Sequence, residues 1–252
     1  MRILCLLLLS FSVWGRHFSV NVPKREEPLE LKTSVIIPCT ANHFQHIGLL
    51  LERYAQQTQV PDEVVISLSQ VELLAEEVVA AVEMGAWPFR VQILRHIGKR
   101  SAGMNRNLAC KIASGDLFLC QDADDLPHPQ RVEIVKFFFE RYEIDHLIHA
   151  WVEEGEGWPE IPAKEALKLR YFKHYDDIGI VYQAGAAVRF HNGNVCLLAF
   201  VAKKRQWEDV LAYDKDRQFN RGVYETFKNH AVTTYPLVAY RNRFSAYDAR
   251  NQ

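Results

Sequence analysis

This chain has almost no excess of positive or negative charge. Its 252 residues carry a formal net charge of −1, and no long run of lysine and arginine occurs. Proteins that bind nucleic acid concentrate positive charge on one surface, so this balance argues against a nucleic-acid partner, although a local basic groove stays compatible with it. Hydrophobic residues make up 48% of the chain and aromatic residues 12%, which is enough for a well-packed core.

Long apolar runs are also absent. The N-terminal run, residues 3–15 between Arg2 and Arg16, is shorter than the roughly 20 residues that span a bilayer as a helix. It has the length of a signal-peptide core. We expect residues 1–15 to be a signal peptide, with an uncleaved membrane anchor or a buried segment as alternatives. Either of the first two places the protein in the lumen of the secretory pathway (ER or Golgi), on a membrane facing that lumen, or outside the cell.

Paired cysteines and glycosylation signals are missing. No CxxC pair and no Asn-x-Ser/Thr acceptor occurs, so glycosylation gives no support to secretion. Most of the cysteines after the leader lie in apolar stretches, which favours small buried thiols. A disulfide in an oxidising compartment stays open, because the sequence does not pair them. These cysteines are Cys39, Cys110, Cys120 and Cys196.

Strand-like and helical patterns alternate after a polar segment at residues 16–32, which we expect to be a linker. This alternation predicts parallel strands joined by right-handed crossovers. We therefore expect a single domain over 33–252, with a doubly wound nucleotide-binding half at 33–125. The predicted strands are 34–38, 63–68, 89–94 and 116–121, and the predicted helices are 43–58, 71–84 and a helix that follows the loop at 98 and ends near 113.

The second half, residues 126–252, is less regular and is expected to hold the acceptor region. Asn192-Gly193 is a strong hairpin signal between two strand-like runs within 178–201. The other expected elements are a helix at 129–142, a strand within 144–152, a helix at 214–228 and a closing strand at 231–241.

Carboxylates gather directly after the fourth predicted strand, as Asp122, Asp124 and Asp125. Ligands of open α/β sheets bind at the carboxyl ends of the strands. Such crowding is unfavourable unless a cation or strong donors offset the repulsion, and hard Mg²⁺ or Mn²⁺ suits oxygen ligands. The alternative is a solvated turn before Pro127.

Basic residues lie before and within the helix that follows the loop at 98. Lys99, Arg100 and Arg106 are placed where a helix N-terminus can bind an anion. We expect Arg106 and Lys99 to contact a diphosphate, with a surface ion pair or a solvated charge as the alternative.

Five segments in this order resemble the GT-A glycosyltransferases, specifically the inverting, DxD-containing family 2-like enzymes. The resemblance covers about residues 33–241 and implies a GT-A fold, an α/β architecture with a doubly wound, mostly parallel central sheet. The segments are 34–39 (first strand), 105–109 (Asn-Arg-Asn-Leu-Ala), 122–125 (Asp-Ala-Asp-Asp), 214–219 (Asp-Lys-Asp-Arg-Gln-Phe) and 235–241 (Tyr-Pro-Leu-Val-Ala-Tyr-Arg).

The resemblance implies a hexosyltransferase-type enzyme. It would move a sugar with inversion from a nucleotide-diphosphate sugar to a hydroxyl of a glycan, protein or lipid, with Mn²⁺ or Mg²⁺. It implies that Asp124 binds the metal, that Asp122 lies near the ribose or the metal, and that Pro38 and Thr40 lie at the nucleotide. Asp125 is left open as a second ligand or a helix cap.

An inverting transfer needs a carboxylate base beside the acceptor hydroxyl. Asp216, at the start of the helix predicted at 214–228, is the first candidate and Asp209 is the second. Each is also a common kind of helix-start acid. The chain departs from the family pattern at Lys215, where a glutamate is usual, and at Ser67-Leu68-Ser69, where an acidic pair is usual.

Two other functions stay open. A nucleotidyltransferase would favour a glycine-rich loop after the first strand, and residues 39–42 contain no glycine. A catalytically degenerate relative that binds sugar or acts as a scaffold is favoured by the two departures above.

Aromatic and histidine residues give weaker signals. Trp151, Trp158 and Trp207 are candidates for an acceptor-sugar platform, with core packing as the equal alternative. His43 and His46 have the spacing of metal ligands, but a surface role is favoured because no third ligand is near them in sequence.

Overall fold

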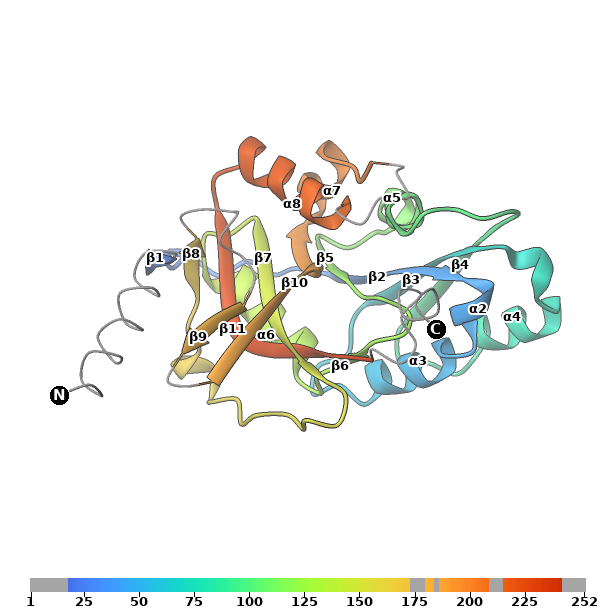
Figure 1. The fold of residues 1–252 in the computed structure, drawn as a ribbon, viewed down its shortest axis with the longest axis horizontal. Coiled ribbons are helices and arrows are strands. Elements are labelled where there is room, and N and C mark those ends of the chain that lie inside the picture. The colour runs from blue at the N-terminus through green and yellow to red at the C-terminus, as the bar shows by residue number, and fades with distance from the viewer. Residues whose placement is uncertain (1–17, 173–179, 184–185, 209–214, 242–252) are drawn as a thin grey trace.

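The computed structural model describes residues 18–172, 180–183, 186–208 and 215–241. The predicted leader and Asp209 lie outside these residues. Within them the chain forms one α/β unit around a mixed sheet, with helices on both faces (Figure 1).

The first half contains the predicted parallel strands. The two central strands of this half carry β-branched apolar runs, and Val35, Ile36 and Ile37 have no solvent exposure, as expected for strands covered on both faces. The four strands pair in the order β5-β2-β3-β4, and all are parallel, which confirms this part of the prediction. They are β2 (Thr33–Thr40), β3 (Glu63–Ser69), β4 (Arg90–His96) and β5 (Leu117–Cys120).

The helices of the first half differ from the prediction at two points. The helix expected at 43–58 is two helices, because the chain tightens into a turn in which the His46 amide donates to the His43 carbonyl at 3.0 Å. The helix expected at 71–84 follows a separate 3₁₀ turn that starts after Gln70, whose φ is 61°. The helices are α2 (Ala41–Phe44), α3 (Ile47–Ala55), η1 (Val71–Leu73), α4 (Glu76–Glu83) and α5 (Ala102–Ile112).

The second half extends the sheet with both parallel and antiparallel pairs. The full order is β1-β8-β11-β7-β10-β5-β2-β3-β4, with β6 on β11 and β9 on β10. In Figure 1, α5, α7 and α8 lie above the sheet and α2, α3 and α4 lie below it. The added elements are β6 (Leu126–Pro127), α6 (Arg131–Arg141), β7 (His146–Glu153), η2 (Lys164–Ala166), β8 (Arg170–Phe172), β9 (Ile180–Gln183), β10 (Ala186–Leu198), α7 (Ala199–Lys204), α8 (Lys215–Thr226) and β11 (His230–Tyr240).

The hairpin predicted at Asn192-Gly193 is wrong. Both residues lie inside β10, which runs from Ala186 to Leu198 and pairs antiparallel with β9 over Ala186–Arg189. The register of β10 against β7 shifts between Phe190 and Val195. A glycine inside a strand often marks such a bulge. The Asn-Gly pair therefore coincides with an irregularity inside a long strand rather than with a hairpin turn.

The described part of the expected linker packs on the domain. β1 (Phe18–Asn21) pairs antiparallel with β8, and Val22 is 3% exposed. The amides of Arg25 and Leu29 donate to carbonyls at the end of α6. Among the described residues, no helix combines the length and hydropathy needed to cross a bilayer. The four described cysteines are buried free thiols.

Candidate active site

The acidic loop, residues 122–125, is held in shape by the glutamine that precedes it. The Gln121 side-chain amide donates to the carbonyl of Asp122 at 2.9 Å and to that of Asp125 at 3.1 Å. Gln121 is 1% exposed. Its single amide therefore fixes both ends of the loop. The sequence reasoning missed Gln121, although a polar residue at the end of an apolar strand was a usable signal.

A buried arginine fixes Gln121 in turn. Arg131 donates to the Gln121 side-chain oxygen at 2.6 Å, to the Tyr54 hydroxyl at 2.8 Å and to the Cys120 carbonyl at 2.6 Å. Both Arg131 and Tyr54 have no solvent exposure. A buried charge is tolerated only with partners of this kind. The acidic loop thus rests on a network that reaches α3 and α6, and no sequence pattern indicated that Arg131 points inward.

The carboxylates of the loop are crowded. Burial, and then the neighbouring Asp122, raise the pKa of Asp124, while His43 and Arg241 oppose the shift. Burial, Asp122 and Asp124 raise the pKa of Asp125 well above its usual range. The Arg241 amide donates to the Asp125 carboxylate at 3.0 Å. The loop therefore holds more negative charge than its protein neighbours neutralise, which is a reason to expect a cation there.

Arg106 joins the acidic loop to the base candidate. Its guanidinium donates to Asp122 and to Asp216, each at 2.5 Å, and its side chain is 2% exposed. Burial disfavours its charge, but Asp216 and Asp122 outweigh burial and raise the pKa of the guanidinium. Arg106 was expected to contact a diphosphate; its two ion pairs within the described residues are to carboxylates. Three separate parts of the chain, α5, the loop after β5 and α8, meet at this residue.

The two asparagines beside Arg106 fasten α5 in different directions. Asn105 is 1% exposed and donates to the Cys39 carbonyl and the Ser69 hydroxyl, each at 3.2 Å. The Ser67 hydroxyl donates to Asn105 at 3.1 Å. The serines that replace an acidic pair at the end of β3 therefore hold the helix.

Asn107 turns the other way, because successive helical residues differ in direction by about 100°. It exchanges two hydrogen bonds with the backbone of Trp207, at 2.8 and 2.9 Å. Trp207 is 3% exposed and stacks on Phe219 of α8, with 3.5 Å between ring centroids. Trp207 thus has a packing role that ties α5 to α8, and it is not an exposed sugar platform.

The loop fits a cation that is shared with a phosphate ligand. Among the described residues, no group of three or more His, Cys, Asp or Glu side chains is arranged to hold a metal alone. Mg²⁺ and related ions commonly bind one or two carboxylates together with waters and substrate phosphates. Asp124, with Asp122 beside it, matches that pattern. His43 of α2 interacts electrostatically with Asp124. This histidine therefore lies nearer to the acidic loop than its position in the sequence suggested.

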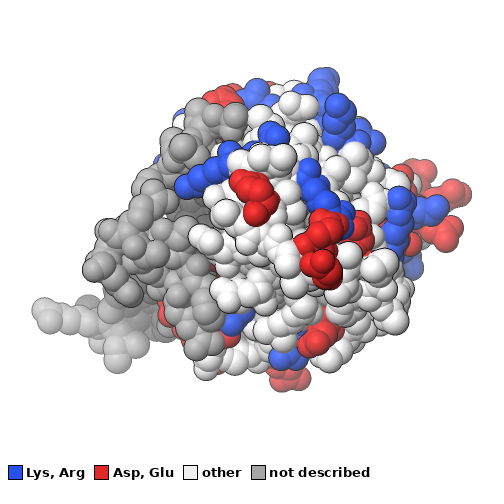
Figure 2. Space-filling model, turned by 90° about the vertical axis from the view of Figure 1, so that its right-hand side faces the viewer, with Lys and Arg blue, Asp and Glu red and all other residues white. Residues whose placement is uncertain are grey.

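The remaining predicted residues lie around this edge. Thr40 is the last residue of β2 and Lys99 is exposed in the segment before α5, so both are near carboxyl ends of parallel strands. Pro38 is buried within β2, in register with Ser67. Asp209 lies outside the described residues. Figure 2 views the molecule from the α2 and α4 side, where acidic and basic side chains are interspersed.

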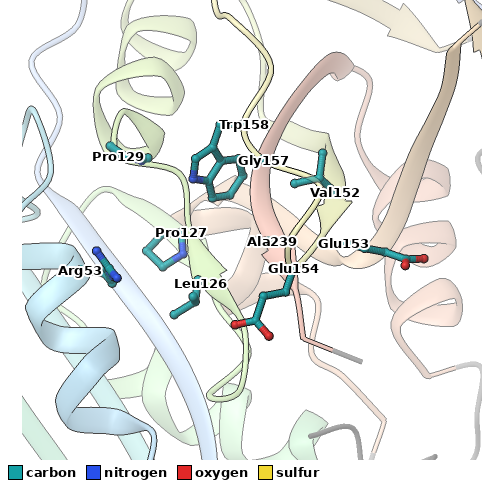
Figure 3. A pocket seen from close by; sticks show the side chains of 11 residues that line it. Arg53, Leu126, Pro127, Pro129, Val152, Glu153, Glu154, Gly157, Trp158 and Ala239 are labelled. Carbon is teal, nitrogen blue, oxygen red and sulfur yellow. The ribbon is translucent and has the colours of Figure 1, made fainter. Parts of the chain in front are cut away.

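A cavity of about 220 Å³ lies beside β6, the strand that follows the acidic loop (Figure 3). Trp158, Pro127 and Pro129 are among its walls, and its charged lining residues are Arg53, Glu153 and Glu154. Trp158, one of the three tryptophans considered from sequence, therefore lines a cavity.

Comparison with known proteins supports the family that the motifs suggest. A family model described as glycosyl transferase family 2 matches residues 34–192. The S. aureus TarS structure (residues 1–349) aligns with a TM-score of 0.62 at 19% identity, covering 83% of this chain and 60% of that one. The mannosyltransferase PcManGT from Pyrobaculum calidifontis, in complex with GDP-Man and Mn²⁺, aligns with a TM-score of 0.57 at 13% identity, covering 92% and 62%.

The same TarS fragment aligns similarly when in complex with UDP, at 20% identity and a TM-score of 0.60, covering 83% and 60%. No curated protein matches the chain. The chain spans about three fifths of the length of these solved neighbours. Their identities are low, so they show a shared GT-A fold, whereas the family model covers more than half of the chain. By fold and by family match, the chain belongs to glycosyl transferase family 2.

Proposed function

We propose that this protein transfers a sugar, with inversion and with a divalent cation, from a nucleoside-diphosphate sugar to a hydroxyl acceptor. One observation carries the proposal: the acidic loop and Asp216 are held on the same buried guanidinium, so a donor site and a base candidate adjoin. The solved neighbours in complex with UDP, with UDP-GlcNAc, and with GDP-Man and Mn²⁺ are compatible with such a donor.

The donor side would be formed by the acidic loop and the start of α5. A bound Mn²⁺ or Mg²⁺ would neutralise the charge that develops on the leaving diphosphate. Asp124 and Asp122 would hold that ion. The N-terminal turn of α5 begins at Ala102, and Lys99 lies shortly before it; helix N-termini favour anionic groups.

The acceptor side would be completed by Asp216. Its carboxylate would take the proton of the attacking hydroxyl, and the Arg106 contact at 2.5 Å fixes one of its oxygens. Arg106 lies between the base and the donor loop, so it would position both rather than react. Asp209, which lies outside the described residues, remains the second candidate for the base.

A non-catalytic sugar-nucleotide-binding role is the second candidate. The observation that favours it is that Arg106 already engages both Asp122 and Asp216, the residues that catalysis would use. Such a protein would bind nucleotide without metal dependence and without turnover. The two functions therefore differ in measurable ways.

The test is calorimetric titration of UDP and GDP with and without MnCl₂, followed by a donor-hydrolysis screen across nucleotide sugars. We expect Mn²⁺-dependent binding and slow hydrolysis of at least one donor. Asp124→Ala should abolish both. Asp116→Ala, an exposed aspartate at the opposite end of β5, is the matched control and should keep both. Metal-independent binding with no hydrolysis would overturn the catalytic proposal.

We further propose that the apolar leader places the enzyme in the secretory lumen or on a membrane facing it, where a nucleotide sugar must then be supplied. Protease protection and carbonate extraction of the tagged full chain test this. Complete digestion in intact microsomes would refute it.

A further inference from the structure

The cavity in Figure 3 is separate from the ion-pair cluster around Arg106. It is bounded by α3, by β6, by the end of β7 and by residues 153–158, and none of its lining residues belongs to the acidic loop. Its volume of about 220 Å³ is below the range of drug-sized ligand pockets. A single small unit, such as one monosaccharide residue, matches this space.

We propose that this cavity binds one saccharide residue of a glycan acceptor, at a subsite next to the one that holds the reacting hydroxyl. The proposal rests on the proposed sugar transfer and names the acceptor class for it. Pyranose rings present flat C–H faces that pack on aromatic rings. Trp158, with Pro127 and Pro129, supplies the apolar walls. The indole is held in place, because His128 packs edge-on against it with 4.8 Å between centroids.

The charges of the cavity favour a neutral, hydroxyl-rich ligand. Arg53 and Glu154 are its charged side chains, whereas the Glu153 side chain points away from it in Figure 3. One carboxylate and one guanidinium leave little net charge, so the cavity offers no excess of positive charge to a diphosphate. Carboxylate oxygens accept hydrogen bonds from sugar hydroxyls and a guanidinium donates to them. An apolar peptide side chain would use the tryptophan but would leave these charged groups without new partners.

The loop that carries Trp158 is held in a defined conformation by its own hydrogen bonds and an ion pair. Gly155 and Gly157 have φ values of 97° and 77°, which allow the chain to turn tightly there. The Glu156 carboxylate accepts the Glu153 amide at 2.7 Å and pairs with Arg189 at 2.9 Å. A wall fixed in this way loses little conformational freedom when a ligand binds, which favours affinity.

The cavity is linked to the acidic loop through one residue. Arg241 pairs with the Glu154 carboxylate at 3.1 Å, and its amide donates to Asp125 at 3.0 Å. Leu126 of β6, another lining residue, directly follows Asp125. A glycan residue seated here would therefore lie close to the donor loop, as a subsite next to the transfer site requires.

Saturation-transfer difference NMR of the full chain, without nucleotide or metal, tests the cavity directly. The probes are N,N′-diacetylchitobiose, cellobiose, lactose, maltose and α-1,2-mannobiose. We expect at least one to bind, and Trp158→Ala to weaken its binding at least tenfold, with Trp158→Phe in between. Trp87→Ala is the matched control, because Trp87 is also half-buried but packs beside Phe89, and it should leave binding unchanged. Thermal melts establish that each variant is folded.

Three results would overturn the inference: no probe binds the wild type, Trp158→Ala binds as well as wild type, or Trp87→Ala weakens binding equally. Trp158-dependent binding of a Phe-containing tripeptide in place of the sugars would assign the cavity to a peptide acceptor instead. Because the samples hold no donor, these outcomes are independent of the nucleotide titrations. Failure of sugar transfer and failure of this subsite therefore give different data.

Discussion

The two halves of the domain bring their site residues together in different ways. In residues 33–125, the polar side chains lie within a few residues of the carboxyl ends of β2, β3 and β5, and parallel pairing places those ends at one edge. In residues 126–241, Asp216 and Arg241 arrive on elements whose neighbours are distant in sequence. There β10 pairs antiparallel with both β5 and β7 and so joins the halves.

This difference shows which half can tolerate change. The first half depends on the local strand-helix-strand order and its crossovers, so its edge is fixed by the scaffold. The second half depends on long-range pairs and connecting loops, which is where acceptor recognition varies most readily. Arg106 belongs to the first half and binds Asp216 of the second. Its substitution is therefore the strongest test of how the two halves are joined.

Arg106→Ala should have the largest effect. It leaves Asp122 and Asp216 facing each other without their common cation, and breaking a buried pair costs about 3 to 5 kcal/mol of unfolding free energy. Transfer should be lost as well. Urea unfolding of the variant measures the first effect and a donor-transfer assay the second.

The control for this change is Arg189→Ala, an arginine with 28% side-chain exposure that also pairs with a carboxylate, Glu156. It should cost at most about 1 kcal/mol, because exposed pairs contribute little. Equal losses in the two variants would show that the Arg106 pair is no more than a surface ion pair.

Asp216→Asn tests the chemistry of the second half with little change in its structure. The asparagine oxygen can still accept the Arg106 hydrogen bond, but it cannot take a proton. We expect kcat to fall roughly 10²- to 10⁴-fold with donor binding retained. Steady-state kinetics and nucleotide titration measure the two quantities, and Asp116→Asn is the matched control. Normal turnover in Asp216→Asn, with loss in Asp209→Asn, would move the base to Asp209.

The sequence predicted the first half better than the second for a physical reason. A buried parallel strand is an uninterrupted apolar run, and a site at its end needs only the residues that follow it, as with Asp122 and Asp124. The polar residues that support the site were missed: Gln121 and Arg131 are buried by tertiary contacts that leave no periodic signal. Arg106 was selected, but its carboxylate partners depend on how α8 docks.

The second half also shows how a local signal can be overruled. Asn192-Gly193 favours a tight turn, yet it lies within β10, where pairing with β7 continues on both sides of a register shift. Asp216 was found only through the ordered motifs of the resemblance, and it lies beyond residues 34–192, which the family model matches. Its assignment as the base therefore stays a prediction.

Two substitutions in α5 test how this helix is held. Asn105→Ala weakens its attachment to the strands of the first half, and Asn107→Ala weakens its attachment to Trp207 of the second half. Asn105→Ala removes two donated hydrogen bonds, to the Cys39 carbonyl and the Ser69 hydroxyl, and leaves the Ser67 hydroxyl without its acceptor in a fully buried site, which should cost about 2 kcal/mol. Asn107→Ala frees the partly buried Trp207 backbone and should cost about 1 kcal/mol. Urea unfolding measures both. A larger loss in Asn107→Ala would place the main attachment of α5 at α8 rather than at the strands.

Acidification should also distinguish the two halves. His146 of β7 and His230 of β11 lie opposite each other, with 3.3 Å between their Nδ1 atoms, and His146 Nε2 is 2.9 Å from the Asn220 side-chain oxygen of α8. Burial, and then His230, lower the pKa of His146 to about 3, and burial also lowers the pKa of His230. Both rings are therefore neutral when folded, whereas the unfolded chain binds protons below its ordinary histidine pKa of about 6.5.

The stability that depends on neutral histidines is thus fully present above about pH 6.5 and is lost as the pH falls toward the folded pKa values, by up to about 1.4 kcal/mol per pH unit for His146. Hydrogen exchange, corrected for its intrinsic pH dependence, should show β7, β11 and α8 losing protection between pH 7.5 and 5.5 before β2 and β3 do. His146→Gln removes one titrating ring and so isolates its contribution from that of the carboxylates; it should reduce the pH slope of stability below pH 6.5. An unchanged pH slope of stability in His146→Gln, or an equal loss of protection in both halves, would contradict this prediction. The parallel half and the mixed half would then unfold as one unit, and they would differ only in how their elements are assembled.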